Sequence, residues 1–140
     1  MRFLLVFLLI PTFVFSQKSN PQMAYQYYIN GEFEKAIHLY EDLMEVHFSP
    51  SYYTPYYICL LKLENYKKAE FLANKMVKKY PKDLRYQLDV IIAKDISFNT
   101  KKSEFSYKKL IRIFDGGHLQ TINLANTFIR NELYQEALDL

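Results

Sequence analysis

The chain is poor in cysteine, and its charges are nearly balanced. Cys59 is the only cysteine among 140 residues, so no disulfide can form within the chain. The 18 basic and 15 acidic residues leave a net charge of +3, which is too small to indicate nucleic-acid binding. Hydrophobic residues make up 50% of the chain and charged residues 24%, as in an ordinary folded domain. Such a fold must be stabilised by packing alone.

The N-terminal apolar run is too short to cross a membrane. It begins at Phe3 after the single positive charge of Arg2 and is broken at Pro11. Even when extended to Phe15, it is shorter than the roughly 20 apolar residues that a spanning helix needs. A positive charge, a short apolar core and a break predict a cleaved signal peptide rather than a membrane anchor.

The predicted cleavage point follows residue 16. Val14 and Ser16 provide small or short side chains at the two positions that a signal peptidase reads, directly before Gln17. The residue directly after this point is Gln17 and not a cysteine, so a lipid anchor is not indicated. Residues 1–16 are therefore the expected signal peptide, and residues 17–140 the exported chain, periplasmic or secreted. Contact with a membrane is expected only through the transient signal peptide.

Residues 28–43 have the pattern of a helix, a turn and a second helix. Asn30 and Gly31 interrupt one apolar-periodic segment, and another begins at Phe33. This second segment continues through Ala36 and Tyr40 with the spacing of a buried helical face. Ala36 is small enough to let two helices approach closely. The segment predicts an all-α fold.

The same pattern recurs at an almost constant interval. Ala69 lies 33 residues after Ala36, and Ala137 lies 68 residues after Ala69, which is two further units of 34. The unit between Ala69 and Ala137 is expected to be centred near Ser103. Four units therefore run in register, and the third departs most from the pattern. A fixed period of this length indicates a repeat protein.

This period and pattern resemble the tetratricopeptide repeat, in an exported bacterial type. The family's unit of about 34 residues carries a small residue, an aromatic, a glycine turn, a second aromatic, an alanine and a closing proline. The first repeat matches best, with Ala24, Tyr27, Gly31, Phe33, Ala36, Tyr40 and Leu43. The second keeps Leu60, Tyr66, Ala69, Met76 and Pro81, and the fourth keeps Leu124, Ala125, Phe128, Tyr134 and Ala137. Departures from the pattern are Glu64 at the glycine turn, Phe98 and Thr100 in the third repeat, and Pro50 as a displaced closing proline.

The resemblance implies a right-handed α-solenoid of about four helix-turn-helix repeats. Their approximate bounds are 17–49, 50–83, 84–117 and 118–140, the last one incomplete. Asn20 and Pro21 are expected to open the first helix, and Asp83 to cap the first helix of the third repeat. Because a proline inside a helix removes one hydrogen bond, Pro55 predicts that the first helix of the second repeat begins at Thr54.

No group of side chains has the spacing of a catalytic or metal site. His38 and Asp42 lie four residues apart on one helical face, but two ligands are too few for a metal ion. Cys59 has no histidine near it in the sequence and is expected to be a buried structural thiol. Gly116 and Gly117 lack the lysine of a phosphate-binding loop and are expected to terminate a helix. The chain is predicted not to be an enzyme, with no cofactor and no metal.

Lysines gather in residues 75–82 and 101–112, in a chain with many tyrosines. Such a surface can bind nucleic acid. Most of these lysines lie on the second helices of repeats, which in this family face the convex side, and an exported protein rarely meets nucleic acid. They are expected to form a solvated face, with no nucleic-acid partner.

The resemblance also implies a concave groove lined by the first helix of each repeat, in which a partner peptide or protein binds. The residues that the register places there are Tyr25, Tyr28, Ile58, Leu61, Lys62, Leu88, Ile92, Asp95, Ile96, Ile122, Asn126, Ile129 and Arg130. Family members that capture a C-terminal carboxylate use Lys, Asn and Arg at positions that here hold Pro21, Tyr25 and Ile58. An apolar groove instead suits an extended or helical peptide held through side-chain pockets. The alternative is that this surface is buried, by tighter closure of the superhelix or by further repeats.

The expected function is a non-catalytic protein-interaction scaffold of the cell envelope. The alternative is an N-terminal docking or sensory region of a larger envelope protein whose activity lies beyond residue 140. The last repeat bears on this choice, since only Tyr134 to Leu140 remain for its second helix, and terminal repeats usually need a polar capping helix. The chain is therefore expected to be the N-terminal part of a longer protein.

The intact mass of the protein recovered from its native cells tests the predicted export. We expect a chain that begins at Gln17, because the signal peptide is removed during export. Mass spectrometry that finds Met1 and the apolar run retained would contradict the prediction. A mass well above that of residues 17–140 would support the larger envelope protein.

Overall fold

The computed structural model describes residues 20–98 and 103–140. For residues 103–106 it describes the backbone alone. Over these ranges the chain is helical and contains no strand, so the all-α class predicted from the sequence is confirmed. The helices are α1 (Pro21–Ile29), α2 (Phe33–Val46), α3 (Pro50–Lys62), α4 (Tyr66–Lys79), α5 (Leu84–Phe98), α6 (Ser103–Arg112), α7 (His118–Arg130) and α8 (Tyr134–Leu138). The predicted signal peptide and Thr100 lie outside the described residues.

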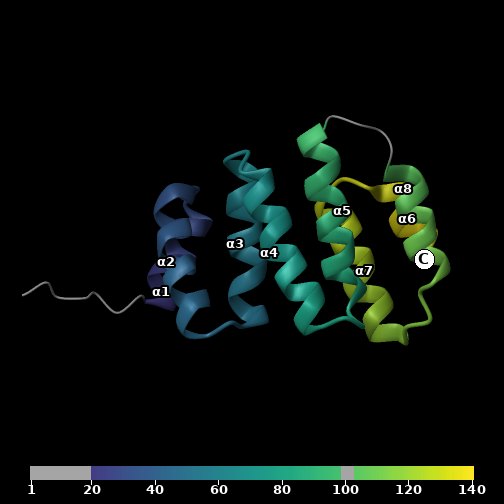
Figure 1. Ribbon diagram of the computed structural model, residues 1–140, viewed down its shortest axis with the longest axis horizontal. Helices are drawn as coiled ribbons and strands as arrows, with labels where there is room; N and C mark the ends of the chain where they lie inside the picture. The colour runs from purple at the N-terminus through teal and green to yellow at the C-terminus, as the bar shows by residue number, and fades with distance from the viewer. Residues whose placement is uncertain (1–19, 99–102) are drawn as a thin grey trace, which may run out of the picture.

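The helices are arrayed along the longest axis of the molecule, from α1 and α2 at one end to α6 and α8 at the other, with α7 beside α5 (Figure 1). From α1 to α5, each helix packs against the next one in the chain. Helix α5 also packs against both α6 and α7, and α7 packs against α8. None of the helices, over the described ranges, combines the length and the apolar character needed to span a bilayer.

Three of the turns between helices share one backbone geometry. Gly31, Glu64 and Glu132 have positive φ angles of 76°, 57° and 61°. In each turn the amide of the following residue donates to the carbonyl oxygen five residues earlier, over 2.9, 2.8 and 3.0 Å respectively. This is the bond of a Schellman helix ending, which satisfies a carbonyl that the helix leaves without a partner. A glutamate therefore adopts, at two turns, the left-handed conformation that Gly31 adopts in the first.

The apolar side chains form two core clusters, and α5 contributes to both. The first cluster lies among α1 to α5 and includes Ala36 and Ala69, both fully buried, as their role in close helix packing predicts. The second cluster lies among α5, α6 and α7 and is centred on Leu88, Ile92 and Phe128. Because α5 has packed neighbours on both sides, its middle is buried at Leu88, Asp89, Ile92 and Ala93, whereas its last turn is exposed.

The predicted helix caps are confirmed at two positions. The side chain of Asn20 accepts hydrogen bonds from the amides of Gln22 and Met23, and Pro21 lies in the first turn, where its missing N–H costs nothing. The carboxylate of Asp83 accepts a hydrogen bond of 3.2 Å from the amide of Arg85 at the start of α5. Both caps satisfy backbone donors that the first helical turn leaves free.

The predicted start of α3 at Thr54 is wrong. The helix begins at Pro50 and contains Pro55 in its interior. An interior proline costs roughly 3 kcal/mol. Burial of Tyr53, Tyr56 and Tyr57 on the same helix outweighs this cost, since a large buried side chain contributes about 1.5–3 kcal/mol.

The left-handed turns predict that two substitutions change the stability of the fold in opposite directions. Gly31→Ala should lower the free energy of unfolding by about 1 kcal/mol, because alanine is strained at positive φ although no atom lies within 4 Å of an added Cβ. Glu64→Gly should raise it by about 0.5 kcal/mol, because the relieved strain exceeds the entropy that glycine loses on folding. Urea denaturation of both variants measures the two changes. Shifts of the same sign would contradict the shared turn geometry.

Candidate functional site

The residues expected to line a groove divide into accessible and buried ones. Leu88 and Ile92 are only 0% and 3% exposed, inside the second core cluster. The expectation that these two face a partner is therefore corrected, because α5 is covered on both sides by packed helices. The others are at least partly exposed, namely Tyr25, Tyr28, Ile58, Leu61, Lys62, Asp95, Ile96, Ile122, Asn126, Ile129 and Arg130.

Two charged residues of the predicted groove form structural contacts instead. Asp95 on α5 accepts a hydrogen bond of 2.8 Å from the hydroxyl of Tyr107 on α6. Arg130, at the end of α7, donates a hydrogen bond of 2.8 Å to the carboxylate of Asp89 on α5. Each contact ties α5 to a neighbouring helix, so these groups are already engaged within the fold.

Asp89 is the centre of a buried polar network that the sequence reasoning missed. Its side chain is almost fully enclosed, with 1% exposure. One carboxylate oxygen accepts from Arg130 and the other from the hydroxyl of Tyr53 at 2.8 Å, while the backbone carbonyl of Asp89 accepts from Tyr57 at 2.7 Å. The network links α3, α5 and α7. The available signal was an acidic residue inside the apolar segment 88–92 of a predicted helix.

Burial raises the pKa of Asp89 from its ordinary value of 3.8 to about 6, because the charged form loses its water. The charges of Arg130 and Arg85 and the hydrogen bond from Tyr53 act in the opposite direction and favour the carboxylate. Burial also raises the pKa of Tyr53 and of Tyr57, and the nearby Asp89 charge adds to both shifts. Both hydroxyls therefore keep their protons and act as donors to Asp89.

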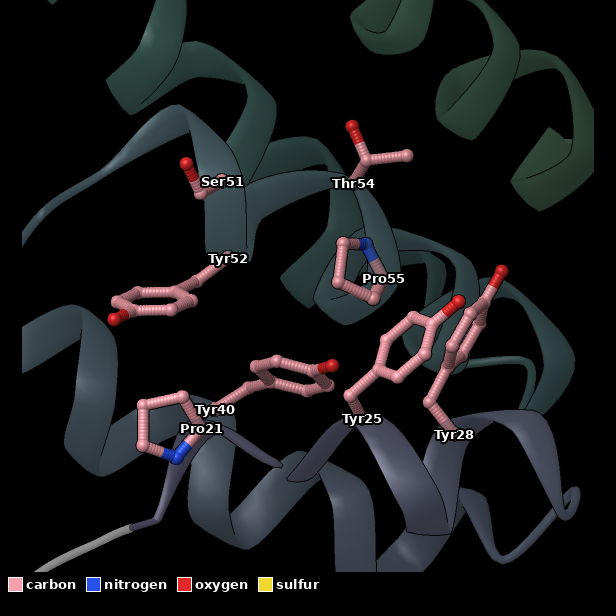
Figure 2. A pocket seen from close by; sticks show the side chains of 8 residues that line it. All are labelled: Pro21, Tyr25, Tyr28, Tyr40, Ser51, Tyr52, Thr54 and Pro55. Atoms are coloured by element: carbon pink, nitrogen blue, oxygen red, sulfur yellow. The ribbon is translucent and has the colours of Figure 1, made fainter. Parts of the chain in front are cut away.

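Tyr25 and Tyr28 meet other residues at a pocket between α1 and α3, which we call the tyrosine pocket. Its volume is about 450 Å³. Figure 2 shows the rings of Tyr25 and Tyr28 side by side on one wall, with Pro55 across from them and the rings of Tyr40 and Tyr52 toward the other end. The complete lining is Pro21, Tyr25, Tyr28, Tyr40, Ser51, Tyr52, Thr54 and Pro55.

Three helices build this pocket. Helix α1 contributes Pro21, Tyr25 and Tyr28, with the two tyrosine ring centroids 6.0 Å apart. Helix α2 contributes Tyr40, whose ring also stacks on Tyr56 with centroids 6.4 Å apart. The first turns of α3 close the other side.

The residues from α3 were missed because of the wrong helix start. A helix beginning at Thr54 would leave Ser51 and Tyr52 in a loop with no defined direction. Because α3 begins at Pro50, these residues and Pro55 lie on one helical segment that faces α1. The N-terminal signal that predicts this start is Ser49, whose side chain accepts a hydrogen bond of 3.3 Å from the amide of Ser51.

A wider hollow of about 1100 Å³ lies near the connection of α4 to α5 and that of α6 to α7. Asp83 and Arg85, which line it, form an ion pair across 2.5 Å. None of the predicted groove residues lines this hollow. The tyrosine pocket is therefore the better candidate for the predicted partner site.

The side chains considered for chemistry lie on different helices, Cys59 on α3 and the pair His38 and Asp42 on α2. Cys59 is buried, and burial raises the pKa of its thiol from 9.0 to about 11, so the thiolate is disfavoured. His38 and Asp42 lie on the exposed face of α2. Within the described ranges, no three histidine, cysteine or acidic side chains lie close enough together to hold a metal ion.

Asp89 predicts a pH dependence of stability. The native carboxyl binds its proton more tightly than the same carboxyl in the unfolded chain, so its stabilising contribution is present below about pH 4 and is lost as the pH rises through about 6. Relative to Asp89→Asn, the free energy of unfolding of the wild type should therefore fall by about 3 kcal/mol between about pH 3 and about pH 7.5, at about 1.4 kcal/mol per pKa unit. Urea denaturation of both proteins at the two ends of the range measures the difference. A constant difference would contradict the raised pKa.

Comparisons with known proteins do not assign this chain to a family. No protein-family model matches the sequence, and no curated protein shows significant similarity to it. The function is therefore inferred from the residues and the geometry of the chain itself.

Proposed function

We propose that this chain is an exported tetratricopeptide-type right-handed α-solenoid of about four repeats. In this proposal it serves as a non-catalytic protein-interaction scaffold of the cell envelope. The three left-handed turns support the repeat register, because Gly31, Glu64 and Glu132 are separated by 33 and 68 residues, the same intervals that separate Ala36, Ala69 and the alanine of the last repeat. A partner peptide or protein would bind along the first helices of the repeats.

The tyrosine pocket is the observation that carries this function. It opens between α1 and α3, the first helices of the first two repeats, which is where the resemblance implies a groove. Its lining combines aromatic faces with hydroxyl groups, and Tyr25 is 53% exposed. Rigid tyrosine side chains provide contact area and hydrogen bonds with little loss of conformational entropy, which suits them to protein recognition.

A non-catalytic role agrees with the chemistry of the described side chains. The thiol of Cys59 is buried and its pKa is raised, which opposes nucleophilic attack. The acidic residue with the most perturbed surroundings, Asp89, is enclosed by Tyr53 and Arg130, so no substrate reaches it. A perturbed carboxyl at a catalytic site would need an open cleft.

Site-specific photo-crosslinking in the native cells tests the proposal. A photo-reactive phenylalanine analogue at position 25 should form a discrete adduct with a partner protein, because this side chain lies at the mouth of the pocket. The same analogue in place of Phe71, an exposed aromatic residue on α4 outside the pocket, is the matched control and should form several-fold less adduct.

A second variant links the adduct to the pocket. Tyr28→Ala, introduced together with the analogue at position 25, should reduce the adduct several-fold while circular dichroism shows that the helices remain folded. Equal adducts from positions 25 and 71, or none from either, would refute a binding scaffold centred on this pocket.

A further inference from the structure

The outer face of α4 combines positive charges with an exposed aromatic ring. The helix contains five lysines and a single acidic residue. Four exposed residues, at intervals of four, four and three, lie within about 80° of the helix circumference. We call them the lysine face: Lys67, Phe71, Lys75 and Lys78. The buried residues of the helix lie on its other side, so this face is directed to solvent.

The charged residues on either side of the lysine face are already bound within the fold. Glu70, the one acidic residue of the helix, pairs with Lys94 of α5 over 3.4 Å. Lys68 pairs with a glutamate of α2, and Lys79 donates a hydrogen bond to a carbonyl just after α2. The helix therefore provides no acidic group to neutralise the lysine face.

The lysines of the face itself have no acidic partner. Among the described residues, no carboxylate lies within ion-pair distance of Lys67, Lys75 or Lys78. The amine of Lys75 lies 4.8 Å from the centroid of the Phe71 ring, and that side chain is 60% exposed. The face thus presents three unneutralised cations around one aromatic ring, which a partner with negative charges and an apolar layer would complement.

Three classes of anionic partner can be compared with this face. Single-stranded nucleic acid binds along a positive groove in which successive aromatic rings stack on successive bases, but the lysine face has only one ring. A peptide is usually held in a groove, and no residue of the lysine face lines either of the two hollows described above. A membrane surface needs neither feature, because it is broad and anionic and accepts an aromatic ring at the boundary of its acyl chains.

We propose that the lysine face docks on a membrane surface that contains anionic phospholipid, with the ring of Phe71 inserted below the headgroups. The apolar stems of the lysines would follow the ring while their amines stay at the phosphates. Eleven residues separate the ends of the face, or about 16 Å along the helix axis, so α4 would lie parallel to the surface. This inference does not depend on the tyrosine pocket, and it adds a membrane contact to the one expected from the signal peptide.

A fluorophore on the lysine face tests the proposal. The chain contains no tryptophan, so Phe71→Trp introduces a unique one. The full chain with this substitution is mixed with vesicles of phosphatidylglycerol and phosphatidylcholine in equal parts. We expect its emission to shift to shorter wavelength and to be quenched by brominated acyl chains, because the ring leaves water. Vesicles of phosphatidylcholine alone should cause neither change, and binding through the apolar residues 3–10 would not alter the emission at position 71.

Tyr134→Trp is the matched control for the fluorophore. Tyr134 is also 60% exposed but lies on α8, so its emission should not change with either kind of vesicle. In the Phe71→Trp chain, Lys67→Gln together with Lys75→Gln should weaken binding to the anionic vesicles about 25-fold, at about fivefold per lysine. Lys35→Gln, at an exposed lysine of α2 that pairs with Glu32, should leave binding unchanged. Urea denaturation of each variant checks that the fold is retained.

Several results would overturn the inference. These are an unchanged emission of Phe71→Trp with the anionic vesicles, an equal change with phosphatidylcholine alone, and equal quenching of Tyr134→Trp. An emission change with a single-stranded oligonucleotide or with polyglutamate, but not with the vesicles, would assign the face to another partner. The cross-links from position 25 report on the tyrosine pocket independently, because an analogue at position 71 that faces lipid still forms no discrete protein adduct.

Discussion

The buried carboxylate of Asp89 is the interaction on which the arrangement of α3, α5 and α7 depends. A carboxylate inside an apolar core is tolerated only when its oxygens are paired. Tyr53 supplies one partner from α3 and Arg130 the other from α7, and Tyr57 adds a bond to the carbonyl of the same residue. These bonds fix the two helices on either side of α5, where the two core clusters meet. Hydrogen bonds of this length add a directional constraint to the close packing of the apolar side chains around α5.

The position of α3 in turn determines the tyrosine pocket. Tyr53 and Tyr57 anchor one face of α3 to α5, which directs Tyr52 and Pro55 toward α1. Tyrosines of the same chain thus serve two purposes. The hydroxyls of Tyr53, Tyr56 and Tyr57 donate to groups of the fold and hold the helices together, whereas Tyr40 lines the pocket.

Local features were predictable where neighbouring residues decide them. Asn20 and Asp83 cap helices as predicted, because a cap depends on side-chain oxygens within three residues of the bonded amides. The start of α3 was not predictable from Pro55, because the cost of an interior proline is local but the burial that outweighs it comes from contacts with other helices. The accessibility of Leu88 and Ile92 was misjudged for a similar reason, since it depends on how many helices pack around α5.

The sequence by itself determined the helical class, the alternation of helices and turns, and the period of the pattern, because apolar spacing, small residues and helix caps act over a few residues. It also predicted two of the pocket's four tyrosines, Tyr25 and Tyr28, as groove residues, without showing what lies across from them. Only the tertiary structure decided that Asp89 is buried and paired and that Tyr40 reaches the pocket. Both outcomes depend on distances between residues that are far apart in the chain, and those distances are set by the packing of whole helices rather than by local sequence.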